Sequence, residues 1–271
     1  MNAPRLSASS YSNTAPLIWS FLYGQNRGRF ELILDNAPAR SAQLLAEKRV
    51  DAALVPVIAY QMIGDVFLIP NVCVGARERV RSVCLVTKGE DLEQVKSVAL
   101  DVSSKTSVAL TRIIFREFLG FEPIWKTAEP KLNEMLETAD CALLIGDPAL
   151  VLSKPPAVAG GLNLRTFDLA ELWKTYTNFG FVFAMWMTRN KTCEIDFAAA
   201  RDEGLNHLDE IIANYEPEIS LSHEDFRKYL SENILYSIDA EMQKGLELYF
   251  KLAHKNGLTE QNKPLAFTGN Y

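Results

Sequence analysis

The fold class follows most directly from residues 97–120, which read SVALDVSSKTSVALTRIIFREFLG. The apolar SVALD is typical of a buried strand, VSSKT of a hydroxyl-rich turn, and the remainder of a helix that ends at Gly120. EPIW, KLNEMLETA and DCALLIG then predict a strand, a helix and a further buried strand. This β-α-β-α-β order is typical of a parallel sheet with helices on its faces.

The same order occurs earlier in the chain. RLSAS is a predicted strand, SYSNT a hydroxyl-rich turn, and APLIWSFLYG a helix with Pro near its start and Gly at its end. Residues 31–35, 39–49 and 51–56 complete this unit as strand, helix and strand. Two such units predict an α/β protein of two lobes. Right-handed crossovers place both hydroxyl-rich turns at the carboxyl ends of strands, where ligands bind in open α/β sheets.

Two further strands are predicted at 80–87 and 180–188, as the connections between the lobes. Helices are expected at roughly 195–215, 222–231 and 239–256. We therefore expect lobe one to contain residues 1–86, completed by 184–271, and lobe two to contain residues 87–183. Residues 154–161, with Pro-Pro and Gly-Gly pairs, are expected to be a loop within lobe two.

Composition excludes several classes of partner. The formal net charge is −6 and Lys and Arg form no long run, so we expect no nucleic-acid partner. No uninterrupted apolar stretch begins the chain, and none of about 18 residues occurs anywhere. We expect a cytoplasmic protein without membrane insertion. The four cysteines and three histidines lack metal-ligand spacing, and no dinucleotide, P-loop or nucleophile-elbow motif occurs, so no metal is expected.

The second hydroxyl-rich turn is the strongest candidate for a binding site. It contains Ser103, Ser104, Thr106 and Ser107 at a predicted helix start. Free N–H groups, the helix dipole and these hydroxyls together favour a carboxylate. Helix capping explains one hydroxyl, but not four.

The first turn holds the candidates of lobe one. Ser9 and Tyr11 are candidate substrate-binding residues. Asn13 is either an N-cap or a donor and acceptor facing the cleft. Because Asn13 lies opposite the second turn, the cleft-facing role is as well supported as the N-cap role.

Two more candidates lie elsewhere. Asp147 follows a buried strand and precedes Pro148, so it is either an N-cap or a carboxylate at the cleft rim that holds a hydroxyl or acts as a base. Ser82 lies on a predicted connecting strand, where its hydroxyl either satisfies backbone groups or lines the cleft.

Six strings, in order along the chain, resemble the chorismate dehydratase family of the futalosine route to menaquinone. They are SYSNTAPL, VDAALVPVIAY, RSVCLVT, ALDVSSKTSVAL, ALLIGDPAL and WKTYTNFGFVFAMW. Lys105 stands where that family more often has Arg, and Asn178 begins a turn that is usually of a Gly-Leu-Pro-Phe type. The resemblance implies a two-lobed type II periplasmic-binding-protein-like fold with two hinge strands.

The resemblance also implies an activity, namely that of a carbon–oxygen lyase (hydro-lyase) without a metal or cofactor. It would convert chorismate to 3-[(1-carboxyvinyl)oxy]benzoate. On this basis Ser103, Ser104, Thr106 and Ser107 would bind a substrate carboxylate. Catalytic roles are expected for Asn13 and Ser82, which would hold the other carboxylate or the departing hydroxyl. The base would be Asp147 or the enolpyruvyl carboxylate of the substrate.

Other functions stay open from the sequence. They are a cytoplasmic solute-binding protein for a small carboxylate, an enzyme acting on a different carboxylate, and a sister enzyme acting on a cyclic futalosine derivative. The sister family has an N-terminal signature of a Ser-Pro-Cys-Pro-Asn type, which SYSNTAP does not match. The sequence leaves the oligomeric state open.

Overall fold

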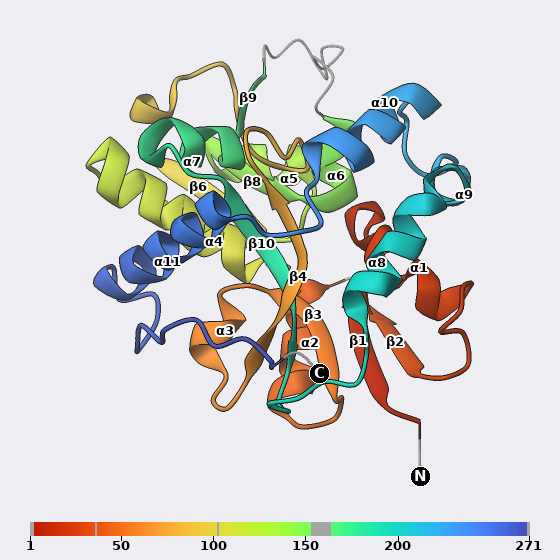
Figure 1. The fold of residues 1–271 in the computed structure, drawn as a ribbon. Helices are drawn as coiled ribbons and strands as arrows, with labels where there is room; N and C mark the ends of the chain where they lie inside the picture. Colours follow the sequence, from red (N-terminus) through yellow and green to blue (C-terminus); the bar gives the residue numbers. More distant parts are fainter. Residues whose placement is uncertain (1–2, 36, 102, 153–163, 270–271) are drawn as a thin grey trace.

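The computed structural model describes residues 3–35, 37–101, 103–152 and 164–269. They form two five-stranded sheets, each in its own lobe (Figure 1). The sheet of lobe one has the order β2-β1-β3-β10-β4. Its strands are β1 (Arg5–Ser9), β2 (Glu31–Asp35), β3 (Ala52–Pro56), β4 (Phe67–Ala76) and β10 (Phe181–Thr188). β1 pairs in parallel with β2 and β3, whereas β10 runs antiparallel to β3 and β4.

The sheet of lobe two has the order β7-β6-β8-β5-β9. Its strands are β5 (Val83–Thr87), β6 (Ser97–Asp101), β7 (Ile124–Ala128), β8 (Cys141–Ile145) and β9 (Arg165–Asp168). β6 is parallel to β7 and β8, and β5 is antiparallel to β8 and β9. Both predicted β-α-β-α-β units are therefore confirmed as α/β layers, while β4 and β9 were not predicted.

Helices cover the faces of both sheets (Figure 1). Lobe one has η1 (Ser12–Thr14), α1 (Ala15–Leu22), α2 (Pro38–Ala46) and α3 (Ala59–Met62). Lobe two has η2 (Leu92–Gln94), α4 (Lys105–Ile113), η3 (Ile114–Leu119), α5 (Leu132–Thr138), α6 (Gly146–Val151) and α7 (Leu169–Thr177). The chain then forms α8 (Phe197–Asn206), α9 (Leu208–Tyr215), α10 (His223–Lys228), η4 (Tyr229–Asn233) and α11 (Ala240–Lys255).

Two of the C-terminal helices begin where polar side chains cap them. Ser222 Oγ accepts a hydrogen bond from the Asp225 N–H (3.2 Å), and an Asp239 carboxylate oxygen accepts one from the Met242 N–H (2.8 Å). Such N-caps satisfy backbone donors that the helix leaves free. The helix predicted over 195–215 is instead two helices, which meet at His207.

The C-terminal helices are divided between the lobes, which differs from the expected assembly. α8 and α9 pack on α1 of lobe one, whereas α11 packs on α4 of lobe two as well as on β10. Two bonds fix α11 there: the Tyr249 hydroxyl donates to the Thr106 carbonyl (3.0 Å), and the Lys255 amine contacts the Glu117 carboxylate (2.6 Å). α11 therefore reinforces the junction of the lobes.

The division between the sheets falls earlier than the predicted boundary after residue 86. β4 ends at Ala76 in one sheet and β5 begins at Val83 in the other, so the first connection is 77–82. Asp168 holds this connection, since its carboxylate accepts from the N–H groups of Val80 (3.1 Å) and Arg81 (2.6 Å). The second connection begins at Asn178, whose φ of 60° is one that Asn tolerates at a helix C-terminus.

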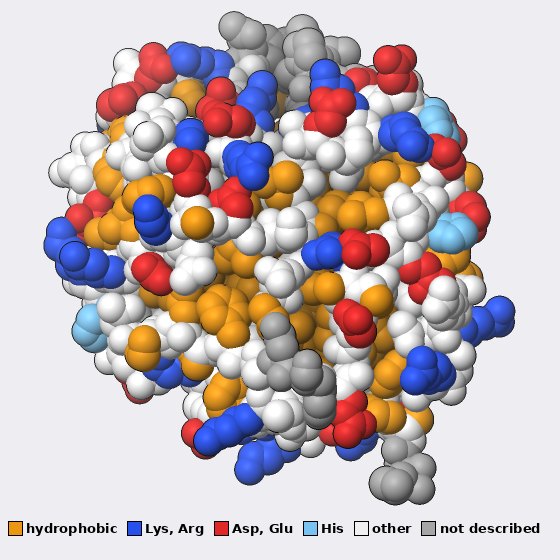
Figure 2. Space-filling model, in the orientation of Figure 1, with side chains coloured by type: hydrophobic (Ala, Val, Ile, Leu, Met, Phe, Trp, Pro, Cys, Tyr) orange, Lys and Arg blue, Asp and Glu red, His pale blue; other side chains and the backbone are white. Residues whose placement is uncertain are grey.

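Acidic and basic side chains are interspersed over the face drawn in Figure 2, with apolar side chains between them. No helix within the described ranges has both the length and the apolar character needed to cross a bilayer. The loop predicted at residues 154–161 lies outside the described residues.

Candidate active site between the two lobes

The first hydroxyl-rich turn links β1 to α1 through η1. Thr14 fixes its shape, because the Thr14 hydroxyl contacts the carbonyl oxygens of Ser9 and Tyr11, each at 2.7 Å. Asn13 is 9% exposed and does not cap α1, whose N-cap position is Thr14. The capping interpretation of Asn13 is therefore wrong, and Asn13 lines the cavity between the lobes.

The second turn links β6 to α4. Ser104 is the N-cap of α4, and its hydroxyl accepts from the Ser107 N–H (3.2 Å). The Ser103 N–H and hydroxyl both donate to one oxygen of Asp101, at 2.8 and 2.6 Å. Burial raises the pKa of Asp101, and the hydrogen bonds from Ser103 oppose that rise. Ser103 and Asp101 thus shape the turn behind the helix start.

A cavity of about 60 Å³ lies where the two turns meet. Six of the predicted residues line it: Ser9, Tyr11, Asn13, Ser104, Thr106 and Ser107. Apolar side chains of both sheets close the rest of its wall, namely those of Leu54, Val74, Val83, Ile145 and Phe183. The structure therefore brings candidates from both lobes to one cavity, while Ser103, Ser82 and Asp147 lie outside its lining.

Thr106 also connects the two lobes. Its hydroxyl accepts from the Ile58 N–H (3.2 Å), which follows β3 of lobe one. A buried N–H without a partner costs about 1–3 kcal/mol, so this bond favours the approach of the lobes seen here.

Asp147 does not cap a helix. α6 begins at Gly146 and its N-cap position is Ile145, without a side-chain cap bond. The Asp147 carboxylate instead reaches lobe one, where it accepts from the Ser12 hydroxyl (2.5 Å) and from the Ser12 N–H (3.2 and 3.3 Å). Burial raises the pKa of Asp147, and the bonds from Ser12 oppose that rise. The capping interpretation of Asp147 is therefore wrong, and its partner Ser12 was not predicted.

Tyr11 crosses between the lobes in the same region. A Cβ added at Gly146, which has a φ of +66°, would meet the Tyr11 ring at 3.0 Å. The Tyr11 hydroxyl lies beside Ser103, whose hydrogen bonding opposes the rise that burial causes in the Tyr11 pKa. Glycine at this position therefore permits both the backbone turn and the close approach of the ring.

Ser82 and Asn13 share a neighbour that sequence reasoning missed. Ser82 is fully buried in the connection before β5, and its hydroxyl donates to the Val80 carbonyl over a long 3.4 Å. Beside both Ser82 and Asn13 lies the hydroxyl of Tyr229, from η4. Tyr229 lies in a segment of charged C-terminal helices, and no local signal distinguishes it from a core tyrosine.

The lobes are closed on each other in this structure. A cavity of about 60 Å³ is far smaller than the roughly 300–1,000 Å³ typical of small-molecule sites. A ligand the size of chorismate therefore needs the lobes to separate before it can enter. The connections at 77–82 and 178–180 are the places where the chain passes between the sheets.

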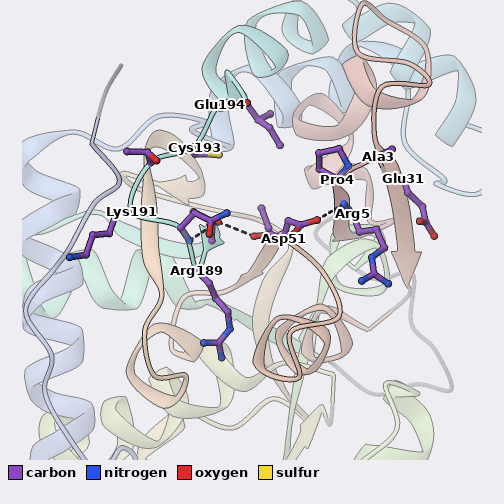
Figure 3. A pocket seen from close by; sticks show the side chains of 14 residues that line it. Ala3, Pro4, Arg5, Glu31, Asp51, Arg189, Lys191, Cys193 and Glu194 are labelled. Carbon is purple, nitrogen blue, oxygen red and sulfur yellow. Dashed lines mark hydrogen bonds between the residues drawn. The ribbon is translucent and has the colours of Figure 1, made fainter. Parts of the chain in front are cut away.

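A larger groove, of about 1060 Å³, lies at the other end of the lobe-one sheet (Figure 3). It is found at the amino ends of β1 and β3, lined by Arg5, Asp51, Arg189, Lys191 and Glu194. Arg189 is bound by the carbonyl oxygens of Leu45 (3.1 Å) and Ala46 (3.2 Å), and Asp51 accepts from the Arg5 N–H (2.7 Å). Because Arg189 and Asp51 are engaged, and ligands of α/β sheets bind at carboxyl ends, the smaller cavity is the candidate active site.

In the described part of the chain, no group of three or more His, Cys, Asp or Glu side chains is placed to hold a metal ion. The site is instead built from hydroxyls, one amide and the N-terminus of α4.

Two α/β lobes with a cavity at the junction of their strand ends are the arrangement of a periplasmic-binding-protein fold. Solved structures share it. A protein from Archaeoglobus fulgidus matches with a TM-score of 0.67 and 14% identity, over 94% of this chain and 97% of that one. The periplasmic aliphatic sulphonate binding protein from Escherichia coli matches with a TM-score of 0.63 and 16% identity, over 100% of this chain and 95% of that one.

The sequence comparisons define the family. A family model described as "Menaquinone biosynthesis" matches residues 4–255. A chorismate dehydratase from Thermus thermophilus is 34% identical over 224 residues, which are 76% of this chain and 79% of that protein. The chain belongs to this menaquinone biosynthesis family, and the resemblance noted in its sequence is confirmed.

Proposed function

We propose that this protein is a chorismate dehydratase, a carbon–oxygen lyase that removes water from chorismate to give 3-[(1-carboxyvinyl)oxy]benzoate. The family membership and the dehydratase from Thermus thermophilus support this reaction. The observation that carries the proposal is the cavity in which Ser9, Tyr11 and Asn13 of lobe one face Ser104 and Ser107 at the start of α4. Such a site suits a small substrate that carries a carboxylate at each end.

The start of α4 would bind one carboxylate. Backbone N–H groups in the first turn of a helix have no intrahelical partner, and the helix dipole favours an anion there. Ser107 and Thr106 add hydroxyls that line the same cavity. Asn13 and Ser9 from lobe one would contact the other end of the substrate, so both lobes are needed for a complete site.

The chemistry explains how such a site suffices. Removal of the C3 proton and the C4 hydroxyl of chorismate creates an aromatic ring, so the elimination is strongly downhill. The ring carboxylate takes up charge as the C3 proton leaves. Donors fixed around that carboxylate stabilise the transition state more than the ground state, which is the source of catalysis.

The base in this proposal is the enolpyruvyl carboxylate of the substrate. The Asp147 carboxylate is already engaged, because the hydroxyl and the N–H of Ser12 donate to it from the opposite lobe. An amide such as Asn13 and an unassisted hydroxyl such as Ser82 are both too weakly basic. Their role is to hold the departing hydroxyl or the second carboxylate, while Asp147 holds the lobes together.

Turnover of chorismate by the purified protein tests the proposal, with products followed by mass spectrometry. The expected product has lost one water, and an Asn13→Ala variant should form it at least about 100-fold more slowly, as for loss of a transition-state donor. Binding of chorismate without turnover would support a solute-binding protein instead. Turnover of a cyclic futalosine derivative, with chorismate untouched, would support the sister enzyme.

A further inference from the structure

One buried tyrosine stands directly behind two of the proposed catalytic side chains. Tyr229 begins η4, a π-helical turn that continues α10, and its side chain is 0% exposed. Its hydroxyl lies beside the side chains of Ser82 and Asn13. The Arg81 guanidinium lies over its ring, 5.9 Å from the centroid. π-helical turns often occur at functional sites, because they redirect a side chain that a regular helix would place elsewhere.

The Tyr229 hydroxyl has an unused hydrogen-bonding capacity. The Tyr229 hydroxyl makes no hydrogen bond of ordinary geometry with a described residue, although the side chains of Ser82 and Asn13 are close enough to bond it. A buried hydroxyl without a partner costs about 1–3 kcal/mol relative to a satisfied one. From this position the hydroxyl can complete a hydrogen bond to Ser82 or Asn13 after a small change in the orientation of either side chain.

The proton of this hydroxyl is fixed. Burial raises the pKa of Tyr229 far above its usual value of 10, and the nearby Asp147 charge raises it further. The phenol is therefore protonated at neutral pH and can donate a hydrogen bond.

Of the two neighbours of Tyr229, Ser82 has a hydroxyl whose hydrogen bonds can rearrange. Its hydroxyl carries one proton and two lone pairs, and its present bond to Val80 is long. If the Tyr229 O–H donates to the Ser82 oxygen, it occupies one lone pair there, and the Ser82 proton can exchange its long bond to Val80 for a bond to a closer acceptor in the cleft. A hydroxyl that accepts one hydrogen bond is also a stronger donor in the next, because the two bonds polarise each other.

We propose that Tyr229 is a positioning residue, which donates to the Ser82 hydroxyl and so turns the Ser82 proton towards the departing hydroxyl of the substrate. This role rests on the proposed dehydratase function. No bond to the substrate is made or broken by Tyr229. Its effect belongs to the chemical step, because the oriented Ser82 proton matters most as charge develops on the leaving oxygen.

The test compares Tyr229→Phe with Tyr236→Phe, and each change removes only a hydroxyl. Tyr236 is a matched control, since it is also buried and its hydroxyl also lacks a partner among the described residues. We expect Tyr229→Phe to lower kcat for chorismate about 10-fold to 100-fold, with KM changed less than about 2-fold. Tyr236→Phe should leave kcat unchanged, and neither variant should melt at a lower temperature than the wild type.

A second comparison separates positioning from a general effect on the fold. In a Ser82→Ala background the Tyr229→Phe change should have no further effect on kcat, because its target is gone. Equal kcat values for Tyr229→Phe and Tyr236→Phe would overturn the proposal. The proposal would also be overturned if the fold-reduction in kcat of the double variant equalled the product of the reductions caused by Tyr229→Phe and Ser82→Ala alone. These outcomes require an active wild type, whereas a wild type that leaves chorismate unchanged overturns the proposed function and the role of Tyr229 with it.

Discussion

The contact between Ser12 and Asp147 is expected to control how tightly the lobes close on the substrate. It joins η1 of lobe one to α6 of lobe two, and the hydroxyl bond is 2.5 Å long. A Ser12→Ala variant removes this hydroxyl but leaves the Ser12 N–H, which also donates to Asp147. Because this contact exists only when the lobes are together, its loss changes the free-energy difference between the open and closed arrangements of the folded protein.

The size of the effect follows from the charge of the acceptor. A hydrogen bond to a charged group contributes about 1.5–3 kcal/mol, and the retained N–H bond places the loss at the lower end. A cost of about 1.5 kcal/mol to closure weakens the apparent affinity for a ligand held by the closed form about 10-fold. We expect KM for chorismate to rise by about that factor, with kcat nearly unchanged, because the chemistry occurs after closure.

The assay is steady-state kinetics of chorismate consumption, together with solution scattering with and without chorismate. Ser20→Ala is the matched control, because Ser20 makes the same kind of bond to Glu203 (2.5 Å) within lobe one. That variant should melt at a lower temperature without a change in KM. A fall in kcat at constant KM for Ser12→Ala would instead place Ser12 in the chemical step and not in closure.

Three further changes test neighbouring parts of the site. Asp147→Asn should keep kcat within about 10-fold of the wild type, because the base is the substrate carboxylate, whereas loss of a catalytic base costs about 100-fold or more. Burial raises the pKa of Asp147 in the folded protein above its unfolded value of about 3.9. The protonated carboxyl group therefore adds to the free energy of unfolding below about pH 3.9, and this stabilisation is lost as the pH rises through the folded-state pKa. The melting temperature of Asp147→Asn should therefore improve relative to the wild type as pH is raised from about 4 to about 7, and a constant difference would contradict this. Gly146→Ala should raise KM several-fold and destabilise the fold by about 1–3 kcal/mol in chemical denaturation, since its φ is +66° and Tyr11 is already at contact. Ser107→Ala should raise KM about 10-fold, the loss of one donor to a carboxylate, and an unchanged KM would place that carboxylate elsewhere.

Much of the architecture could be predicted because it is encoded locally. SVALD and DAALVP are short apolar runs next to turns, and each appears as a strand at the expected position. β4 was missed because Pro70 and Asn71 interrupt it, and proline favours a loop or an edge. In the structure β4 is an edge strand of its sheet, where a missing N–H is tolerated.

The candidate site was predictable where it depends on the two turns, and not where it depends on long-range packing. Asn13 and Ser107 each follow the carboxyl end of a strand, as predicted, and the packing of the two lobes brings them to one cavity. Asp147 followed by Pro148 has the pattern of a helix start, and only the structure shows that its partner is Ser12 of the other lobe. Tyr229 belongs to a predicted helical segment, but its direction depends on how that segment packs.

Proton nuclear magnetic resonance of a reaction mixture with chorismate identifies the product and so decides whether the protein is a chorismate dehydratase. We expect the ring signals of chorismate to be replaced by those of a meta-substituted benzoate that keeps its enolpyruvyl protons. Chorismate left unchanged by the folded protein, or a para-hydroxybenzoate formed together with free pyruvate, would show that it is not.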